Sequence, residues 1–315
     1  MKRGLLILVC VYGILAAWAD GSWAVQYRIV DLGTPEGSEF SAACSINDNG
    51  QIVGWAQSVS GDCHALLWQN GSTIDLGTPG GFNGQALDIN NSGQVVGVSF
   101  LVSGDYHAFL WQNGSMTDLG TPGGSQFSAA CSINDNEQIV GWAYYTSSWT
   151  SRAFLWQNGS TIDLGTLGEG TESGANSMNN SGQVVGGSYN ALSETGHAFL
   201  WQNGSMIDLG TLGGGSSDAW GINDNGQIVG SADLVSGGYH AFLWQNGSMT
   251  DLGTPGGFYS EALDINNSGW IVGTSYDDSG NYHAVLWQPV PEPASLLAVL
   301  CLIGALPVLT RRRPQ

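Results

Sequence analysis

The feature that most constrains the fold is a motif that recurs six times along the chain. It reads His-Ala, then Phe, Leu or Val, then Leu-Trp, and successive copies lie 43 or 45 residues apart. Two further motifs, Asp-Leu-Gly-Thr and Ile-Asn-(Asp or Asn)-(Asn or Ser)-Gly, recur with similar spacing. Units of this length cannot bury an apolar face alone, so residues 27–288 must form one array of stacked units. The six copies of the first motif end at Trp68, Trp111, Trp156, Trp201, Trp244 and Trp287.

Each unit is predicted to contain four short β-strands. In the first unit these strands cover residues 41–47, 51–56, 64–69 and 72–76. Asn-Gly dipeptides, which favour tight hairpins, separate the first strand from the second and the third from the fourth. A Gly-Thr-Pro-Gly-Gly run then ends regular structure. Four strands per unit of about 44 residues is the pattern of a β-propeller blade.

Side-chain alternation in the third strand indicates that each sheet packs between two neighbours. Leu66 and Trp68 point to one face, while Ala65 and Leu67 point to the other, so both faces are apolar. A sheet with one face in water would alternate apolar and polar residues. A glycine in the middle of every second strand, Gly54 in the first unit, predicts close approach of another backbone.

The ends of the array predict how it closes. It opens with residues 27–32, which read as a fourth strand without the preceding three, and ends with residues 283–288, a third strand without a fourth. An open solenoid would leave both ends bare and would need capping units. We therefore expect an all-β, six-bladed β-propeller of four-stranded blades, closed by pairing of the N-terminal strand with the last blade.

The repeated polar residues are interpreted as structural. His64 and its equivalents lie on separate blades and would not converge on one metal ion, so each is expected to form a hydrogen bond within its own blade. The tryptophans that end the motif are expected to be buried between blades. No cofactor is predicted, and no catalytic residue. A calcium site at turns such as Asn47-Asp48-Asn49-Gly50 remains an alternative, although these turns lack the closing acidic ligand of an EF-hand loop.

The net charge of the repeat region limits the kinds of molecule that it can bind. Residues 27–288 carry 24 acidic residues against two arginines, a net charge near −22. Such a surface repels phosphate backbones, which excludes nucleic acid and leaves neutral sugars and divalent cations. Three cysteines fall in this region. Cys44 and Cys63 could pair in an oxidising compartment, whereas Cys44 and Cys131 occupy equivalent positions that favour a small apolar role.

Both ends of the chain read as processing segments. Residues 1–24 combine a basic start, a short apolar run and small residues, as in a secretory signal peptide cut after Ala19 or Ala24. In residues 289–315, Pro291-Glu292-Pro293 precede an apolar stretch that could form a hydrophobic transmembrane helix. Arg311, Arg312 and Arg313 follow and would stay on the cytoplasmic side. A permanent single-pass anchor is the alternative, although the stretch is short for a full span.

Two family resemblances follow from these motifs. The units are similar to HAF-type extracellular repeats, as in His107-Ala108-Phe109, with departures at Arg152, Met178 and Glu137. The C-terminal order of Pro-Glu-Pro, apolar stretch and arginine cluster resembles the PEP-CTERM sorting signal. The resemblances imply processing by signal peptidase and an exosortase. They also imply membrane anchoring before cleavage, and then a place at the cell surface or in the extracellular matrix.

These observations favour a non-enzymatic function. We expect a binding or structural scaffold of the cell surface or exopolysaccharide matrix, with extracellular polysaccharide as the partner. Aromatic loop residues such as Tyr144, Tyr145 and Trp149 could stack on sugars. The alternative is a hydrolase or lyase of extracellular polysaccharide, which should carry acidic or histidine residues at positions unique to one blade.

Overall fold

The computed structural model describes residues 31–35, 37–78, 83–190 and 193–289. The chain divides into two compact units, Met1–Gly33 and Thr34–Gln315, and all described strands belong to the second unit. The described residues contain 23 strands and no α-helix, and their one helical element is the short 3-10 helix η1 (Pro122–Gly124).

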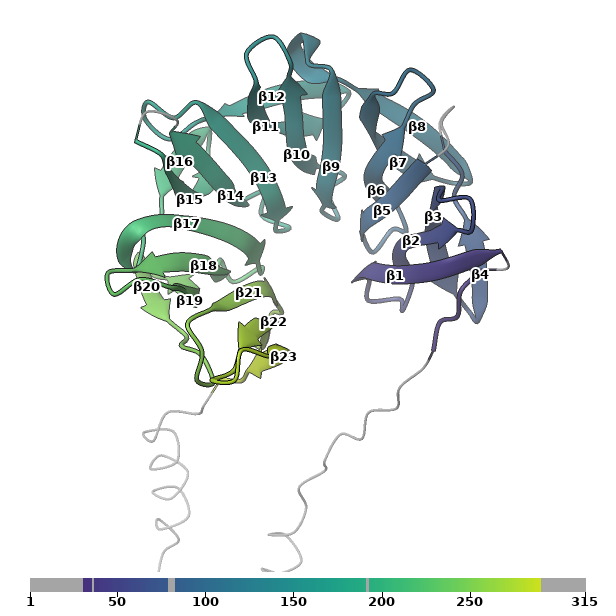
Figure 1. Cartoon of the computed structure of the whole chain (residues 1–315). Helices are drawn as coiled ribbons and strands as arrows, with labels where there is room; N and C mark the ends of the chain where they lie inside the picture. The colour runs from purple at the N-terminus through teal and green to yellow at the C-terminus, as the bar shows by residue number, and fades with distance from the viewer. Residues whose placement is uncertain (1–30, 36, 79–82, 191–192, 290–315) are drawn as a thin grey trace, which may run out of the picture. The chain divides into compact units, whose positions relative to one another are not determined.

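The strands form six antiparallel sheets, each built from strands that are consecutive in the sequence (Figure 1). We number these sheets as blades 1 to 6 along the chain. Their strands are β1 (Ser38–Ile46), β2 (Ile52–Ser58), β3 (Cys63–Gln69) and β4 (Ser72–Asp75) in blade 1; β5 (Asn83–Ile89), β6 (Val95–Phe100), β7 (Tyr106–Gln112) and β8 (Ser115–Gly120) in blade 2; β9 (Phe127–Ile133), β10 (Ile139–Tyr145), β11 (Thr150–Gln157) and β12 (Ser160–Gly165) in blade 3; β13 (Glu172–Met178), β14 (Val184–Asn190), β15 (Thr195–Gln202) and β16 (Ser205–Asp208) in blade 4; β17 (Gly213–Ile222), β18 (Ile228–Leu234), β19 (Tyr239–Gln245) and β20 (Ser248–Asp251) in blade 5; and β21 (Ser260–Ile265), β22 (Ile271–Tyr276) and β23 (Tyr282–Trp287) in blade 6.

The predicted fold class is confirmed as an all-β, six-bladed β-propeller with four-stranded blades. In every blade the strands pair in chain order, so the first strand lies at one edge and the last at the other. The first strand of each blade contacts the first strand of the next, from β1 with β5 to β17 with β21. Blade 6 has three strands among the described residues.

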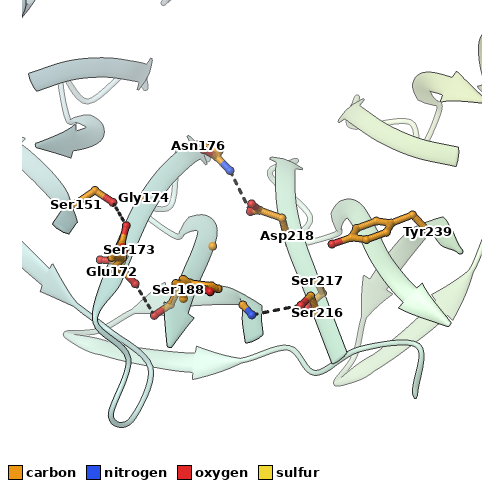
Figure 2. A pocket seen from close by; sticks show the side chains of 13 residues that line it. Ser151, Glu172, Ser173, Gly174, Asn176, Ser188, Ser216, Ser217, Asp218 and Tyr239 are labelled. Atoms are coloured by element: carbon orange, nitrogen blue, oxygen red, sulfur yellow. Dashed lines mark hydrogen bonds between the residues drawn. The ribbon is translucent and has the colours of Figure 1, made fainter. Parts of the chain in front are cut away.

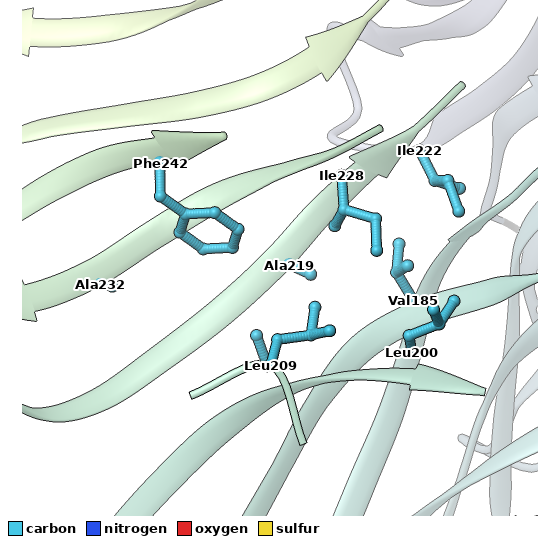
Figure 3. Packing of buried hydrophobic residues seen from close by; sticks show 9 residues of the cluster. Val185, Leu200, Leu209, Ala219, Ile222, Ile228, Ala232 and Phe242 are labelled. Carbon is cyan, nitrogen blue, oxygen red and sulfur yellow. The ribbon is translucent and has the colours of Figure 1, made fainter. Parts of the chain in front are cut away.

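The core consists of separate apolar clusters, each lying between two consecutive blades. Between blades 4 and 5, Val185 and Leu200 pack against Ala219, Ile228 and Phe242, all at most 3% exposed (Figure 3). The other four clusters repeat this arrangement at each successive junction. Both faces of a blade are therefore buried, which explains why its strands are apolar on both sides.

The repeated tryptophans take part in this packing to different degrees. Trp68 and Trp156 are buried, at 5% and 6% exposed. The other four are partly buried and pack against the clusters: Trp111, Trp201, Trp244 and Trp287. The six tryptophans thus lie between blades as expected, and two of them are fully buried.

The glycine of each second strand faces a β-bulge in the first strand. In blade 3 the register shifts opposite Gly141, and Cys131 is the extra residue of β9. A Cβ atom built on Gly141 would lie 1.9 Å from the carbonyl oxygen of Ala129, closer than any real contact. The close backbone approach predicted from the sequence is therefore present, and a bulge produces it.

The outer faces of the first and last blades differ from all the others. Ile46 in blade 1 is 64% exposed, whereas its five equivalents are at most 7% exposed. Val272 in blade 6 is 49% exposed, whereas its equivalents are fully buried. The closing strand was predicted at residues 27–32, most of which lie outside the described residues. The two that are described, Asp31 and Leu32, form no strand. Closure by that strand stays a prediction.

The signal peptide at residues 1–24 and the sorting segment from Pro291 to Arg313 also lie outside the described residues. In the part of the chain that the structure describes, no helix is long and apolar enough to cross a membrane.

Candidate functional site

The structure places each repeat histidine beside an aspartate of its own blade. The Nδ1 atom of His64 lies 2.8 Å from Oδ2 of Asp75, the aspartate that begins the Asp-Leu-Gly-Thr motif. The other Oδ atom of Asp75 accepts a hydrogen bond from the N–H of Gly77. The same pairing recurs at His107, His197 and His240, whereas His283 pairs with Asp277. In five of the six blades, a histidine thus links two segments of the same blade through an aspartate.

The Ile-Asn turns link the blades to one another through side chains. We call their third residues the turn row, in which aspartate and asparagine alternate: Asp48, Asn91, Asp135, Asn180, Asp224 and Asn267. The backbone N–H of each of the first five donates to Oδ1 of the next residue in the row, at 2.9–3.0 Å. The Nδ2 groups of the asparagines donate to Oδ2 of the neighbouring aspartates.

The alternation in the turn row is a complementarity of donors and acceptors. An ionised carboxylate only accepts hydrogen bonds, whereas an amide also donates, so each aspartate needs an asparagine beside it. The turns of all six blades line a cavity of about 420 Å³. Among the described residues, no group of three or more His, Cys, Asp or Glu side chains is placed to hold a metal ion.

Other residues singled out from the sequence are distributed over the molecule. Cys44, Cys63 and Cys131 are all free thiols, so the bridge between Cys44 and Cys63 is not formed. Burial and the charge of Asp88 raise the pKa of Cys131 to about 12. Trp149 is 75% exposed, and the Tyr145 hydroxyl donates to a backbone carbonyl. None of these residues lines the pocket described next.

A pocket of about 360 Å³ lies where blades 4 and 5 meet (Figure 2). Its walls are largely polar: serine hydroxyls, the amide of Asn176, the carboxylates of Glu172 and Asp218, and the ring of Tyr239. The backbone of β14 lines it at Gly187. The full set of lining residues is Ser151, Glu172, Ser173, Gly174, Asn176, Gly187, Ser188, Tyr189, Gly196, Ser216, Ser217, Asp218 and Tyr239.

Hydrogen bonds fix the polar groups of this pocket. Asn176 Nδ2 donates to Asp218 Oδ1 at 3.3 Å and to the carbonyl of Ala219 at 2.9 Å (Figure 2). The Ser151 hydroxyl donates to Glu172 Oε2 at 3.4 Å. The Ser188 hydroxyl donates to the carbonyl of Glu172 at 3.0 Å. The pocket therefore presents a preset arrangement of donors and acceptors.

Asp218 is the electrostatically unusual residue of the pocket. Burial between the blades raises its pKa to about 7, opposed by a hydrogen bond from the backbone of Ala219, while the charge of Glu261 adds to the rise. The pKa of Tyr239 is also raised, by burial and by nearby carboxylates that include Asp218. A carboxyl group with a raised pKa in a pocket makes that pocket a candidate functional site.

The sequence analysis missed Asp218 and Glu172. At the strand position of Asp218, the preceding blades carry Ala42, Gln85, Ala129 and Gly174. The signal was therefore available, because a carboxylate replaces a small or neutral residue at this position in the last two blades, as Asp218 in blade 5 and Glu261 in blade 6. Such a residue differs from the repeat in only some of the blades, so it does not belong to the motifs that the units share.

No family model and no curated protein matches the sequence. Among solved structures, the chain is similar to a puromycin hydrolase complexed with PGG, at a TM-score of 0.54 and 15% identity over 80% of this chain. It is also similar to TolB from Acinetobacter baumannii, at a TM-score of 0.51 and 11% identity over 75% of this chain. The chain spans 44% and 60% of these two chains.

A six-bladed β-propeller lectin from Aleuria aurantia also matches, at a TM-score of 0.42 and 9% identity, over 80% of this chain and 94% of that chain. The first two similarities support the β-propeller fold alone, because identities this low carry no information on activity.

Proposed function

We propose that this protein is an exported, non-enzymatic scaffold that binds carbohydrate of the cell surface or exopolysaccharide matrix through the pocket between blades 4 and 5. The observation that carries the proposal is the lining of that pocket. Hydroxyl, amide and carboxylate groups surround Tyr239, which offers a ring face together with a polar tip. Sugar hydroxyls act as both donors and acceptors, so they match a wall that contains both.

The charge of the protein supports the same class of ligand. Within the described residues, Arg152 is the one lysine or arginine, and the surface is otherwise dominated by carboxylates. Such a field disfavours nucleic acid, phosphorylated ligands and uronate-rich polymers. It is compatible with neutral or amine-bearing sugars.

A second candidate function rests on two carboxylates that line the same pocket. Asp218, with its raised pKa, could donate a proton, and Glu172 could act as the base or nucleophile of a polysaccharide hydrolase. Product release from a polysaccharide would distinguish this function from binding, because a scaffold retains the polymer intact.

Binding is tested by applying the purified protein and its Asp218→Ala variant to a glycan array. We expect the protein to bind a limited set of glycans, and the variant to bind them with an affinity at least about tenfold lower. Unchanged binding in the variant would place the glycan site elsewhere, and release of reducing ends from a bound polymer would establish the hydrolase. Ser60→Ala, at an exposed loop serine outside the pocket, is the control variant.

We also propose that the protein is exported by its N-terminal signal peptide and sorted by its C-terminal segment. Exosortase cleavage near Pro291–Pro293 would release the blades into the matrix, with the arginine tail left behind. Mass spectrometry of the surface fraction is expected to find chains that end near Pro293. An intact C-terminus at Gln315 would instead indicate a permanent anchor.

The same proposal includes closure of the propeller, with residues 27–32 as the fourth strand of blade 6. The turn row supports it, because its hydrogen bonds run from Asp48 to Asn267 and the alternation would continue from Asn267 back to Asp48. Two exposed aromatic residues support it as well. Phe40 and Tyr282 occupy the repeat positions at which Phe127 and Tyr106 stack, with ring centroids 4.4 Å apart, between blades 2 and 3.

Deleting residues 27–33 is therefore expected to leave the edge of β23 unpaired, which lowers stability or promotes association between chains. Urea denaturation and size-exclusion chromatography measure both effects. An unchanged midpoint in a monomeric variant would show that this segment is not the closing strand.

A further inference from the structure

The pocket between blades 4 and 5 occupies the place of a missing tryptophan. In blade 3, Trp142 lies opposite Ala129 and Ala153 in neighbouring strands. The residue at the same position in blade 4 is Gly187, opposite Gly174 and Ala198. The indole that occupies this position in blade 3 has no counterpart in blade 4.

The surroundings of the two positions correspond as well. The ring of Trp142 contacts Tyr106 of blade 2, with centroids 5.9 Å apart, and its Cβ lies 4.0 Å from the point where Gly174 of blade 4 would carry a Cβ. The residue that matches Tyr106 is Ser151, and the residue that matches Gly174 is Asp218. Both line the pocket. The region around Trp142 is therefore filled by aromatic rings, while the equivalent region one blade later is hollow and carries a carboxylate.

Gly187 is necessary for this hollow. A Cβ atom built on it would lie 2.8 Å from Oδ1 of Asp218, so any side chain there would require the Asp218 carboxylate to move. The vacated volume adjoins Tyr239, whose ring could lie against the flat face of a bound ring. The equivalent position in blade 3 holds the indole ring of Trp142, so a ring-shaped ligand suits the space beside Gly187.

Among the residues that the structure describes, no lysine or arginine pairs with the carboxylates of the pocket. Arg152, the one lysine or arginine among the described residues, follows Ser151 in β11, and alternation directs its side chain to the opposite face of the sheet. The groups that face Asp218 are the Asn176 amide, the backbone at Gly187, Tyr239 and the carboxylate of Glu261. Glu172 lines the same pocket. A ligand that supplies a positive charge would offset the burial and the charge of Glu261, which together raise the pKa of Asp218.

We propose that the pocket takes one ring of an amino sugar with a free ammonium group, and that the ammonium pairs with Asp218. This inference rests on the proposed carbohydrate-binding function and specifies its ligand. Charge-assisted hydrogen bonds to a half-buried carboxylate are among the stronger polar contacts, so they distinguish the amine from its uncharged analogues.

The test compares three probes of equal length by isothermal titration calorimetry at pH 7.5: oligomers of glucosamine, of N-acetylglucosamine and of glucose. We expect the glucosamine oligomer to bind at least about tenfold more tightly than the other two. Asp218→Asn keeps the shape of the site and is expected to remove that preference. Equal affinity for all three oligomers would overturn the amino-sugar assignment while leaving carbohydrate binding intact.

A double variant tests the location of the ring. Gly187→Trp combined with Asp218→Gly recreates the pair that Trp142 and Gly174 form one blade earlier, so the protein is expected to fold with a filled pocket. Binding of the glucosamine oligomer should then be lost, while circular dichroism and thermal unfolding remain close to those of the wild type. Retained binding by the folded double variant would place the site elsewhere. If neither the oligomers nor any glycan on the array binds, the proposed function fails as well.

Discussion

Gly141→Ala is expected to destabilise the protein by at least about 4 kcal/mol, the range reached when a substitution forces the backbone to move. The new methyl group would lie 1.9 Å from the Ala129 carbonyl oxygen and 2.9 Å from its carbon. These are backbone atoms of the bulged strand β9, so no side-chain rotation relieves the clash. Urea denaturation followed by tryptophan fluorescence measures the loss.

Gly174→Ala provides a matched control. Gly174 also lies within a strand of the same propeller, but the nearest atom to its added Cβ would be the Trp142 Cβ at 4.0 Å. We expect a change within about 1 kcal/mol. If both variants lose the same stability, the cost comes from strand propensity in general and the bulge geometry is not responsible.

Asp218→Asn is expected to stabilise the protein at pH 8 by roughly 2 to 4 kcal/mol, since a shift of one pKa unit corresponds to about 1.4 kcal/mol. The pKa of Asp218 is raised in the folded state to about 7, from 3.8. The folded protein therefore binds this proton more tightly than the unfolded chain, and stability falls as pH rises from about 4 to 7. Above pH 7 the folded protein carries the full cost of the buried charge, which the asparagine removes.

The stabilisation should shrink as pH falls and vanish near pH 4, where the carboxyl group of Asp218 is protonated in the folded protein. Urea midpoints measured at pH 8, 6 and 4 follow this change. Asp278→Asn removes an equal charge from an exposed position and corrects for the general repulsion in an acidic protein. A stabilisation by Asp218→Asn that is independent of pH, or no larger than that of Asp278→Asn, would contradict the buried-charge explanation.

The fold could be predicted largely from the sequence because the same motifs of strands, turns and glycines recur in six units. The predicted strand 64–69 corresponds to β3 (Cys63–Gln69), and the prediction of close backbone approach at Gly54 and its equivalents was correct. The turn glycine of blade 3 is replaced by Glu137, which nevertheless keeps a left-handed φ of 62°. The neighbouring strands thus determine this turn even where the residue disfavours it.

The candidate site could not be predicted in the same way. Asp218, Glu172 and Gly187 come from three strands in two blades, and their meeting depends on which blade lies beside which. The bulge was also not predicted. It shifts the pairing of the first and second strands by one residue, and no particular residue type marks its position. Its extra residue is Cys131 in blade 3 and Trp220 in blade 5, a variability that itself marks a position outside the paired ladder.

In a propeller closed as proposed, the alternation of the turn row constrains the number of blades. Asparagine amides donate to the aspartates beside them in the row, so two neighbouring aspartates would set acceptor against acceptor, whereas two neighbouring asparagines could still pair a donor with an acceptor. If the propeller closes, strict alternation around the ring requires an even number of blades. Inserting a single blade whose turn carries an aspartate would then place two aspartates side by side, whereas the gain or loss of two adjacent blades preserves the alternation. Relatives with the same alternating turns are expected to have an even number of blades, and two blades, not one, form the unit by which such an array can grow.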